Sequence, residues 1–250
     1  MGALRVHSIR FSLVIPAHNE ADYLPQLLDT VDAARRRYRG GEEAIEVVVA
    51  DNASTDVTAE VARARGCRVA YVEKRAIAAA RNGGARIARG AVVCFTDADM
   101  RIHPDTFNAI DDALATGKYV GGATGVRLER MSLGLAAAYA MMIPMVWVMG
   151  MDTGVVFCRR EDFDAIGGYD ENLLCAEDVR FLLDLKRVGR SRRQKLARCT
   201  SAKAICSTRK FDEHGEWHYV KMLLTAPFYF VFSRKAFEKF ARRYWYDNQR

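Results

Sequence analysis

The stretch AVVCFTDAD, residues 91–99, decides the fold class of this 250-residue chain. An uninterrupted strand-forming run, residues 91–96, ends in two acidic side chains, Asp97 and Asp99. In open α/β proteins, ligands bind at the carboxyl ends of the buried parallel strands, which is where these acids fall. Because side chains alternate between the two sides of a strand, we expect both carboxylates to point the same way. Two carboxylates that converge at such an edge can hold a hard divalent cation.

Strands and helices alternate around this stretch. Strand-length apolar runs cover residues 11–15, 45–50, 68–72 and 91–96, and segments with helical spacing cover residues 21–37, 56–65, 76–89 and 104–116. After residue 118 the alternation stops, and further strands are expected at residues 119–126, 155–158 and 195–199. No linker or repeat divides the chain. We therefore predict one α/β domain with a Rossmann-like, mostly parallel nucleotide-binding sheet flanked by helices and a smaller second half.

The composition narrows the class of protein. Lysines and arginines number 38 against 31 acids, and the formal charge of +7 suits a phosphate-bearing ligand, an anionic membrane surface or nucleic acid. No motif of interleaved basic and aromatic residues is present, so we do not expect a nucleic-acid partner. The six cysteines form no C-x-x-C pair, so we expect reduced, mostly buried thiols in a cytoplasmic protein. The N-terminal apolar stretch is too short and too interrupted for a signal peptide.

The turn after the second strand carries another acid. Asp51 ends that strand, and Ser54, Thr55 and Asp56 precede the next helical segment. In one interpretation, Ser54 or Thr55 caps the helix and Asp56 complements its dipole. In the other, Asp51 accepts hydrogen bonds from a nucleobase or a ribose. Both interpretations hold together, because a cap formed by the later residues leaves Asp51 for a ligand.

The turn after the first strand, PAHNE at residues 16–20, contains no glycine. This excludes the glycine-rich dinucleotide fingerprint and the phosphate-binding P-loop. His18 and Glu20 are therefore either polar contacts to a sugar nucleotide, or a strand exit followed by an acid at a helix N-terminus.

Short motifs occur in a fixed order along the chain: VIPAHNE at residues 14–20, DNASTD at 51–56, RNGGA at 81–85, DAD at 97–99, GGYDE at 167–171 and ED at 177–178. In this order they resemble glycosyltransferase family 2 over residues 11–190. The resemblance implies a GT-A fold, a nucleotide-diphospho-sugar donor of the UDP or GDP type and a hydroxyl acceptor. It also divides the chain into a nucleotide-sugar-binding half (11–117), an acceptor and catalytic half (118–210) and a helical C-terminal segment (211–250).

The resemblance implies roles for individual donor-side residues. Pro16, Glu20 and Asp51 would lie at the nucleoside, and Asp97 would lie near the ribose and the donor sugar. Asp99 would bind Mg²⁺ or Mn²⁺. Because some metal-dependent members take a third ligand from a late histidine, His214 is a candidate ligand, and the nearby His218 is a weaker one.

The chemistry of glycosyl transfer agrees with these roles. A leaving diphosphate needs a cation or positive side chains, and Lys74, Arg75 and Arg81 cluster between the third strand and its helix. For Arg75, a solvated helix face is the simpler interpretation. An inverting transfer also needs a carboxylate that deprotonates the acceptor hydroxyl, and the resemblance gives this role to Asp178. Glu177 and Asp178 open a helical segment, where acids also favour the helix dipole.

The reaction expected from these residues is a non-processive transfer of one sugar. Processive polysaccharide synthases of this family carry Q-x-x-R-W after the base, whereas Gln194 is followed by KLARC. A sugar-nucleotidyltransferase would need a glycine-rich basic loop after the first strand, which residues 16–20 do not provide. A non-catalytic nucleotide-sugar-binding protein is the other alternative, and Asp99 and Asp178 argue against it.

Residues 131–151 contain no charged side chain and formally meet the length of a membrane-spanning helix. A span there would put Asp97 and Asp99 on one side of a bilayer and Asp178 on the other, so we predict that the segment does not cross. It is either a core helix or subunit contact, or part of a surface that binds anionic lipid together with the apolar residues 222–232 and the basic, aromatic residues 234–246. The second option predicts peripheral contact at the inner face of the membrane and suits a lipid-linked acceptor.

Overall fold

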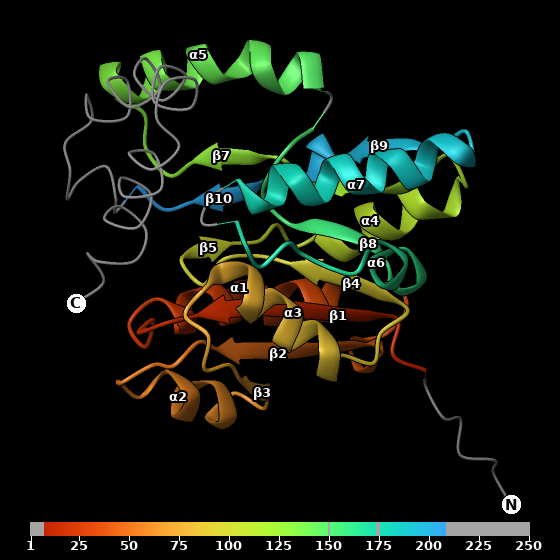
Figure 1. Ribbon diagram of the computed structural model, residues 1–250. Helices are drawn as coiled ribbons and strands as arrows, with labels where there is room; N and C mark the ends of the chain where they lie inside the picture. Colours follow the sequence, from red (N-terminus) through yellow and green to blue (C-terminus); the bar gives the residue numbers. More distant parts are fainter. Residues whose placement is uncertain (1–7, 150, 174–175, 209–250) are drawn as a thin grey trace, which may run out of the picture.

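A computed structural model describes residues 8–149, 151–173 and 176–208 (Figure 1). Its centre is a seven-stranded sheet with the strand order β3-β2-β1-β4-β8-β6-β9. β8 pairs antiparallel with β4 and β6, and the other neighbours in this sheet pair in parallel. The strands are β1 (Phe11–Ala17), β2 (Ile45–Asp51), β3 (Arg68–Tyr71), β4 (Val92–Phe95), β6 (Tyr119–Ala123), β8 (Val156–Arg159) and β9 (Lys195–Arg198). The predicted α/β class with a mostly parallel sheet is confirmed.

Helices cover both faces of this sheet. On one face, buried residues of α1 (Leu24–Arg37), α2 (Thr58–Ala64) and α4 (Thr106–Ala115) share a core with Phe11, Leu13 and Ile15 of β1. On the other face, α3 (Ile77–Ile87), α6 (Arg160–Ile166) and α7 (Glu177–Ser191) share a core with Val14 of the same strand. β1 is therefore apolar on both sides because it is buried on both sides. Two short 3₁₀ helices, η1 (Glu42–Ala44) and η2 (Thr200–Ala202), complete the main body.

A second, three-stranded sheet was not expected from the sequence. It has the order β5-β10-β7 and consists of β5 (Met100–Arg101), β7 (Val126–Leu128) and β10 (Ala204–Cys206). The single strand predicted at residues 119–126 is wrong, because the chain leaves the large sheet after Ala123 and enters the small one at Val126. Gly125 lies between them with φ +81°, a left-handed conformation that glycine adopts without a side-chain clash.

The cap predicted for the second helix is also different. Neither Ser54 nor Thr55 caps it: the N-cap position is Val57, without a side-chain cap, and Asp56 Oδ1 accepts the backbone N–H of Thr58 at 3.0 Å. The helix consequently begins at Thr58, two residues later than predicted. Ser54 and Thr55 instead form hydrogen bonds with Asn19 in the turn at residues 16–20.

The apolar segment at residues 131–151 contains α5 (Leu133–Met149). No helix within the described ranges is long and apolar enough to cross a membrane. Leu135 and Ala138 are buried, whereas the Leu133 side chain is 85% exposed. Residues 222–232 and 234–246 lie outside the described residues.

The described cysteines are free thiols, as predicted. Cys67, Cys94, Cys158 and Cys199 are buried, and Cys206 is half-buried. Burial raises the pKa of the Cys67 and Cys199 thiols to about 11, so they stay protonated at neutral pH.

Candidate active site

The first and second turns of the carboxyl edge are joined by side chains. Asn19 Oδ1 accepts the backbone N–H of Thr55 at 2.8 Å, and Ser54 Oγ accepts the backbone N–H of Asn19 at 3.1 Å. Asn19 has φ +53°, a left-handed conformation that asparagine tolerates better than most residues. The backbone N–H of Glu20 donates to Thr58 Oγ1 at 2.9 Å, so the turn at residues 16–20 is fixed to the start of α2. The two loops therefore form one ordered surface.

His18 connects the second and third turns. Its Nε2 lies 2.8 Å from Arg75 Nη2, and its Nδ1 lies 2.8 Å from the carbonyl oxygen of Asn52. Because a guanidinium can only donate, Nε2 accepts, and Nδ1 then carries the proton that goes to the carbonyl. The Asn52 amide donates to the carbonyls of Val72 and Lys74 at 3.0 and 2.7 Å. Arg75 is thus a partner of His18 rather than a purely solvated side chain.

Asp51 lies at the end of β2 and is buried. Its Oδ1 accepts the backbone N–H of Ser54 at 3.0 Å, so one of its oxygens orders the loop. The expectation that the loop leaves all of Asp51 for a ligand is therefore wrong for that oxygen.

Asp97 and Asp99 lie in a turn after β4 and not on a continued strand. β4 ends at Phe95, and the backbone N–H of Met100 donates to the Asp97 carbonyl at 3.2 Å. The strand alternation used to align the two carboxylates therefore does not apply to them. The Asp97 side chain is 56% exposed and Asp99 is half-buried. Both still follow the carboxyl end of a central strand.

Arg81 of α3 joins the DAD turn to the start of α7. Its side chain is only 4% exposed. Nη2 donates to Asp97 Oδ1 at 2.9 Å, and Nη1 donates to Glu177 Oε1 at 2.9 Å and lies 2.9 Å from Asp178 Oδ1. The guanidinium carbon lies 5.1 Å from the centre of the Tyr169 ring. Burial opposes the charge, but these neighbours outweigh it and hold the pKa of Arg81 well above its ordinary value.

Asp178 is an acid whose proton affinity is increased by its surroundings. Its pKa is raised to about 6: burial is the largest cause, Arg81 opposes it, and the negative charges of Glu177 and Asp97 add to it. Its side chain is nevertheless 28% exposed, so one side remains open to solvent. Tyr169 stacks on Phe181 with 4.2 Å between ring centroids, which supplies an apolar wall to the cluster. A carboxylate with a pKa close to neutrality is suited to proton transfer.

Asn82, the residue after Arg81, fixes the loop between α6 and α7. Its Oδ1 accepts the Tyr169 N–H at 2.8 Å, and its Nδ2 donates to the Tyr169 carbonyl at 2.9 Å and to Glu171 Oε1 at 3.0 Å. Lys74 Nζ contacts Glu171 Oε2 at 3.0 Å. The Asn82 hydrogen bond, with Lys74, lowers the pKa of Glu171. Lys74 is therefore paired with an acid from the second half of the chain.

The structure thus brings Asp97, Arg81 and Asp178 into one cluster, with Pro16, His18, Glu20, Asp51 and Lys74 in or beside the neighbouring turns. Glu177, Tyr169 and Asn82 complete the arrangement but were not predicted as site residues. Each of them lies in a quoted motif, Glu177 in ED, Tyr169 in GGYDE and Asn82 in RNGGA, and this membership was the signal available in the sequence.

The candidate site offers few donors for the divalent cation that the sequence predicts. The part of the chain that the structure describes contains no group of three His, Cys, Asp or Glu side chains arranged to hold a metal. His214 lies outside the described residues. Asp99, with Asp97 two residues earlier, offers carboxylate oxygens, and Mg²⁺ commonly binds one or two carboxylates together with substrate phosphates. These donors therefore fit a cation that is completed by a diphosphate.

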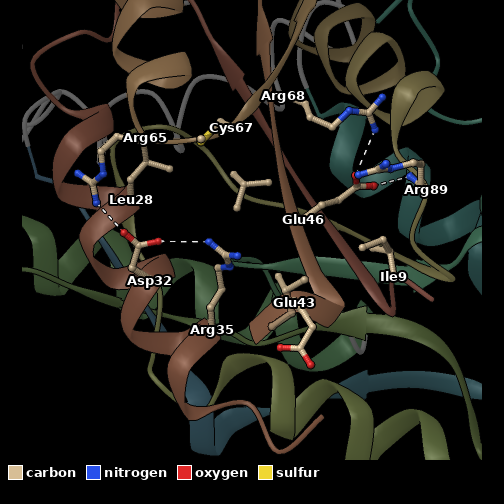
Figure 2. Close-up of a pocket in the computed structure, with 13 residues that line it drawn as sticks. Ile9, Leu28, Asp32, Arg35, Glu43, Glu46, Arg65, Cys67, Arg68 and Arg89 are labelled. Atoms are coloured by element: carbon tan, nitrogen blue, oxygen red, sulfur yellow. Dashed lines mark hydrogen bonds and ion pairs between the residues drawn. The ribbon is translucent and has the colours of Figure 1, made fainter. Parts of the chain in front are cut away.

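A cavity of about 220 Å³ lies at the opposite edge of the sheet, beside the start of β2 (Figure 2). Its charged side chains satisfy one another: Arg65 contacts Asp32 at 2.8 Å, and Arg68 and Arg89 bond Glu46 at 3.1 and 2.9 Å. Glu46 is the second residue of β2 and lies beside this cavity, whereas Asp51 ends the same strand at the candidate site. The cavity is therefore separate from the site.

The comparisons with known proteins agree with this geometry. The family model described as glycosyl transferase family 2 matches residues 12–138, which is just over half of the chain. A validoxylamine A glucosyltransferase of Streptomyces hygroscopicus subsp. jinggangensis (strain 5008) is 34% identical over 110 residues. That match covers 42% of this chain and 25% of the relative, so the comparison concerns only part of a longer protein.

Solved structures share the fold. TarS residues 1–349 of S. aureus, in complex with UDP-GlcNAc, superpose with a TM-score of 0.58 at 18% identity, covering 79% of this chain and 58% of that one. Mannosyltransferase PcManGT of Pyrobaculum calidifontis, in complex with GDP-Man and Mn²⁺, gives 0.59 at 19% identity, covering 94% and 73%. A longer TarS structure is covered over only 44% of its length. These neighbours have the GT-A fold. With the fold shared and just over half of its residues matching the family model, the chain belongs to glycosyl transferase family 2.

Proposed function

We propose that this protein transfers one sugar from a nucleotide-diphospho-sugar to an acceptor hydroxyl, with inversion and without processive elongation. The observation that carries the proposal is the contact of one buried guanidinium, that of Arg81, with both Asp97 and Asp178. It brings the acid expected beside the donor sugar to the acid expected as the base. The family match, and relatives solved with UDP-GlcNAc and GDP-Man, support a UDP- or GDP-type donor.

The donor would lie along the carboxyl edge of the sheet. Pro16, His18, Glu20 and Asp51 belong to the ordered pair of turns that would receive the nucleoside. Lys74 supplies positive charge on the phosphate side, and Asp97 is accessible to the donor sugar. Asp99, together with His214, would hold Mg²⁺ or Mn²⁺, and such a cation stabilises the negative charge of a departing diphosphate.

Asp178 would act on the acceptor. Because its pKa is about 6, it is mostly ionised at neutral pH and can still accept a proton from an attacking hydroxyl. In an inverting transfer, the hydroxyl oxygen forms the new bond to the anomeric carbon as the bond to the diphosphate oxygen breaks. The hydroxyl proton then resides on an Asp178 carboxylate oxygen. The partly open side of Asp178 provides access for this acceptor.

A ligand screen tests the donor half of the proposal. Thermal unfolding is followed with UDP-, GDP- and dTDP-sugars, each with and without Mn²⁺. A donor present at 100 times its Kd stabilises the folded state by about 2.7 kcal/mol, so one nucleotide series is expected to raise Tm in a Mn²⁺-dependent manner.

Two variants sharpen this screen. Asp99→Asn is expected to remove most of the Mn²⁺-dependent part of nucleotide affinity in calorimetry, because one hard anionic ligand is lost. Asp164→Asn, at an exposed acid on α6, is the matched control and is expected to behave as the wild type. Unchanged Mn²⁺-dependent affinity in Asp99→Asn would contradict the metal assignment. Donor binding without any transfer or nucleotide release would favour the non-catalytic alternative.

A further inference from the structure

We infer that Arg81 is a positioning residue, which holds Asp178 and Asp97 in one arrangement and does not bind the donor diphosphate directly. The inference rests on the proposed function and replaces the direct phosphate contact expected for this arginine with a different role. Its basis is the geometry of the guanidinium, its burial and the packing of the helix that carries it.

The polar ends of the guanidinium are already occupied. Nη1 contacts a carboxylate oxygen of Glu177 and one of Asp178, and Nη2 contacts one of Asp97, each at 2.9 Å. Nε has no hydrogen-bond partner, but it is buried, so a phosphate cannot reach it while the side chain keeps this position. With 4% of its side chain exposed, Arg81 presents little surface to a ligand. Lys74, whose side chain is 56% exposed, is better placed to supply charge to a phosphate.

The backbone of α3 holds Arg81 in this position. A Cβ added at Gly84 would lie 2.4 Å from Val14 Cγ1, and one at Gly83 would lie 2.4 Å from Val72 Cγ2. The two glycines therefore let α3 pack closer to the sheet than any other residue would allow. Because interiors are close-packed, the helix cannot shift outward to carry Arg81 to a ligand without losing these contacts. The glycines of the RNGGA motif act through packing and not through a phosphate cradle.

The charges around Asp178 show what Arg81 does there. The groups that face this carboxylate are Glu177 of its own helix, Arg81 of α3, Asp97 of the turn after β4 and the Tyr169 hydroxyl of the loop before α7. Arg81 is the cation among these four. Burial and the two acids favour the protonated form of Asp178, and Arg81 favours the ionised form that a base needs. It therefore keeps the base ionised at neutral pH while fixing its distance from Asp97.

Arg81→Lys tests the role, because lysine keeps the charge but cannot serve three carboxylates in a fixed plane. Arg86→Lys, at an exposed residue of the same helix, is the matched control. We expect Arg81→Lys to change the donor-nucleotide Kd by less than about threefold, to lower kcat by about tenfold or more and to raise the pKa of Asp178. That pKa is read directly from the carboxyl ¹³C resonance, assigned with Asp178→Asn, and needs no turnover.

Glu177→Gln gives the opposite test and does not depend on Arg81→Lys being folded. The variant removes the negative charge of Glu177, which competes with Asp178 for the Arg81 guanidinium. The pKa of Asp178 is therefore expected to fall. An increase of tenfold or more in nucleotide Kd for Arg81→Lys, with kcat unchanged, would overturn the inference in favour of a phosphate ligand. So would an Asp178 resonance that titrates identically in the wild type, Arg81→Lys and Glu177→Gln. A wild-type protein that binds nucleotide but transfers no sugar contradicts the proposed function alone. The role of Arg81 is still tested in that case, because the pKa of Asp178 is measured by NMR without turnover.

Discussion

One buried positive charge, that of Arg81, contacts three acids at the candidate site. Asp97, Glu177 and Asp178 come from segments about 80 residues apart, yet each contacts the Arg81 guanidinium at 2.9 Å. A buried cation without partners is costly, and so is a set of buried acids without a cation. Losing the charge of Arg81 would leave Glu177 and Asp178 without their cation, so variants of this cluster need a separate check of folding.

Replacing Asp178 with asparagine tests the base directly. The change keeps the size of the side chain but removes its ability to accept a proton, so we expect kcat to fall by about two to four orders of magnitude, the usual range for a lost general base. Donor Kd is expected to stay nearly constant, since Asp178 lies on the acceptor side. The measurements are steady-state kinetics, calorimetry with the nucleotide and thermal unfolding.

Two outcomes would contradict this role for Asp178. A loss of donor binding together with a large drop in Tm would show that the residue is a structural part of the start of α7. A product whose anomeric configuration matches that of the donor, as read by NMR, would show retention and remove the need for this base.

For single residues, the sequence predicted that Asp97 and Asp178 belong to the site, but it did not predict that Arg81, which contacts both, is buried. Asp97 and Asp178 follow recognisable motifs, so both were predicted as site residues. The burial of Arg81 depends on how closely α3 approaches the sheet, which is set by Gly84 against Val14 and by Gly83 against Val72. Such long-range packing leaves no periodic signal in the sequence.

The central strands were predictable because both of their faces are buried. β1 and β2 are buried on both sides and appear in the sequence as continuous apolar runs. The boundary between β6 and β7 was missed because Gly121 and Gly122 lie inside β6, so a third glycine, Gly125, did not mark a strand end in the sequence. β5 and β10 are too short, at 2 and 3 residues, to give an alternation.

The start of β2 carries a second ion-pair group that supports the sheet. Glu46 accepts the Ser12 hydroxyl at 2.6 Å and bonds Arg68 and Arg89, and its side chain is 7% exposed. Burial raises its pKa, but these hydrogen bonds outweigh burial and lower it below the ordinary 4.5. Because the pKa is lower in the folded state, the resulting stability is present above about pH 4.5 and is lost as the pH falls through the folded-state pKa.

Glu46→Gln is expected to reduce this pH dependence. It removes the charge that pairs β1, β2 and β3, so urea unfolding at pH 7 should show a loss of about 1.5 to 3 kcal/mol, the range for hydrogen bonds to a charged group. Between pH 5 and 3 the variant should lose less further stability than the wild type. Glu60→Gln, at an exposed acid of α2, is the control. Parallel stability curves for the wild type and Glu46→Gln over that range would show that Glu46 does not contribute in this way.

At the scale of the whole molecule, α5 lies at one end and exposes apolar side chains. Figure 1 shows α5 beyond β7 and β10, at the end of the molecule opposite α2 and β3. The Tyr139 hydroxyl donates to the Val126 carbonyl at 3.5 Å, which ties α5 to β7. Met131, Leu133 and Met141 expose 59%, 85% and 40% of their surface near this helix. We propose that this exposed apolar surface contacts anionic lipid and brings a lipid-linked acceptor near the site at the inner face of a membrane.

Flotation with liposomes tests this proposal. With phosphatidylglycerol vesicles, the protein is expected to float at low salt and less at high salt, because basic residues at 234–246 and the overall charge of +7 add a screened attraction to the apolar contact. Met131→Asp is expected to weaken flotation, since a charge at the lipid boundary is unfavourable. Val57→Asp is the matched control, because Val57 is 58% exposed but lies at α2 at the other end of the molecule. Protein that stays at the bottom of the gradient at both salt concentrations excludes the lipid contact. Equal losses in the two variants would show that binding depends on charge alone, leaving α5 as a helix that covers the small sheet or another subunit.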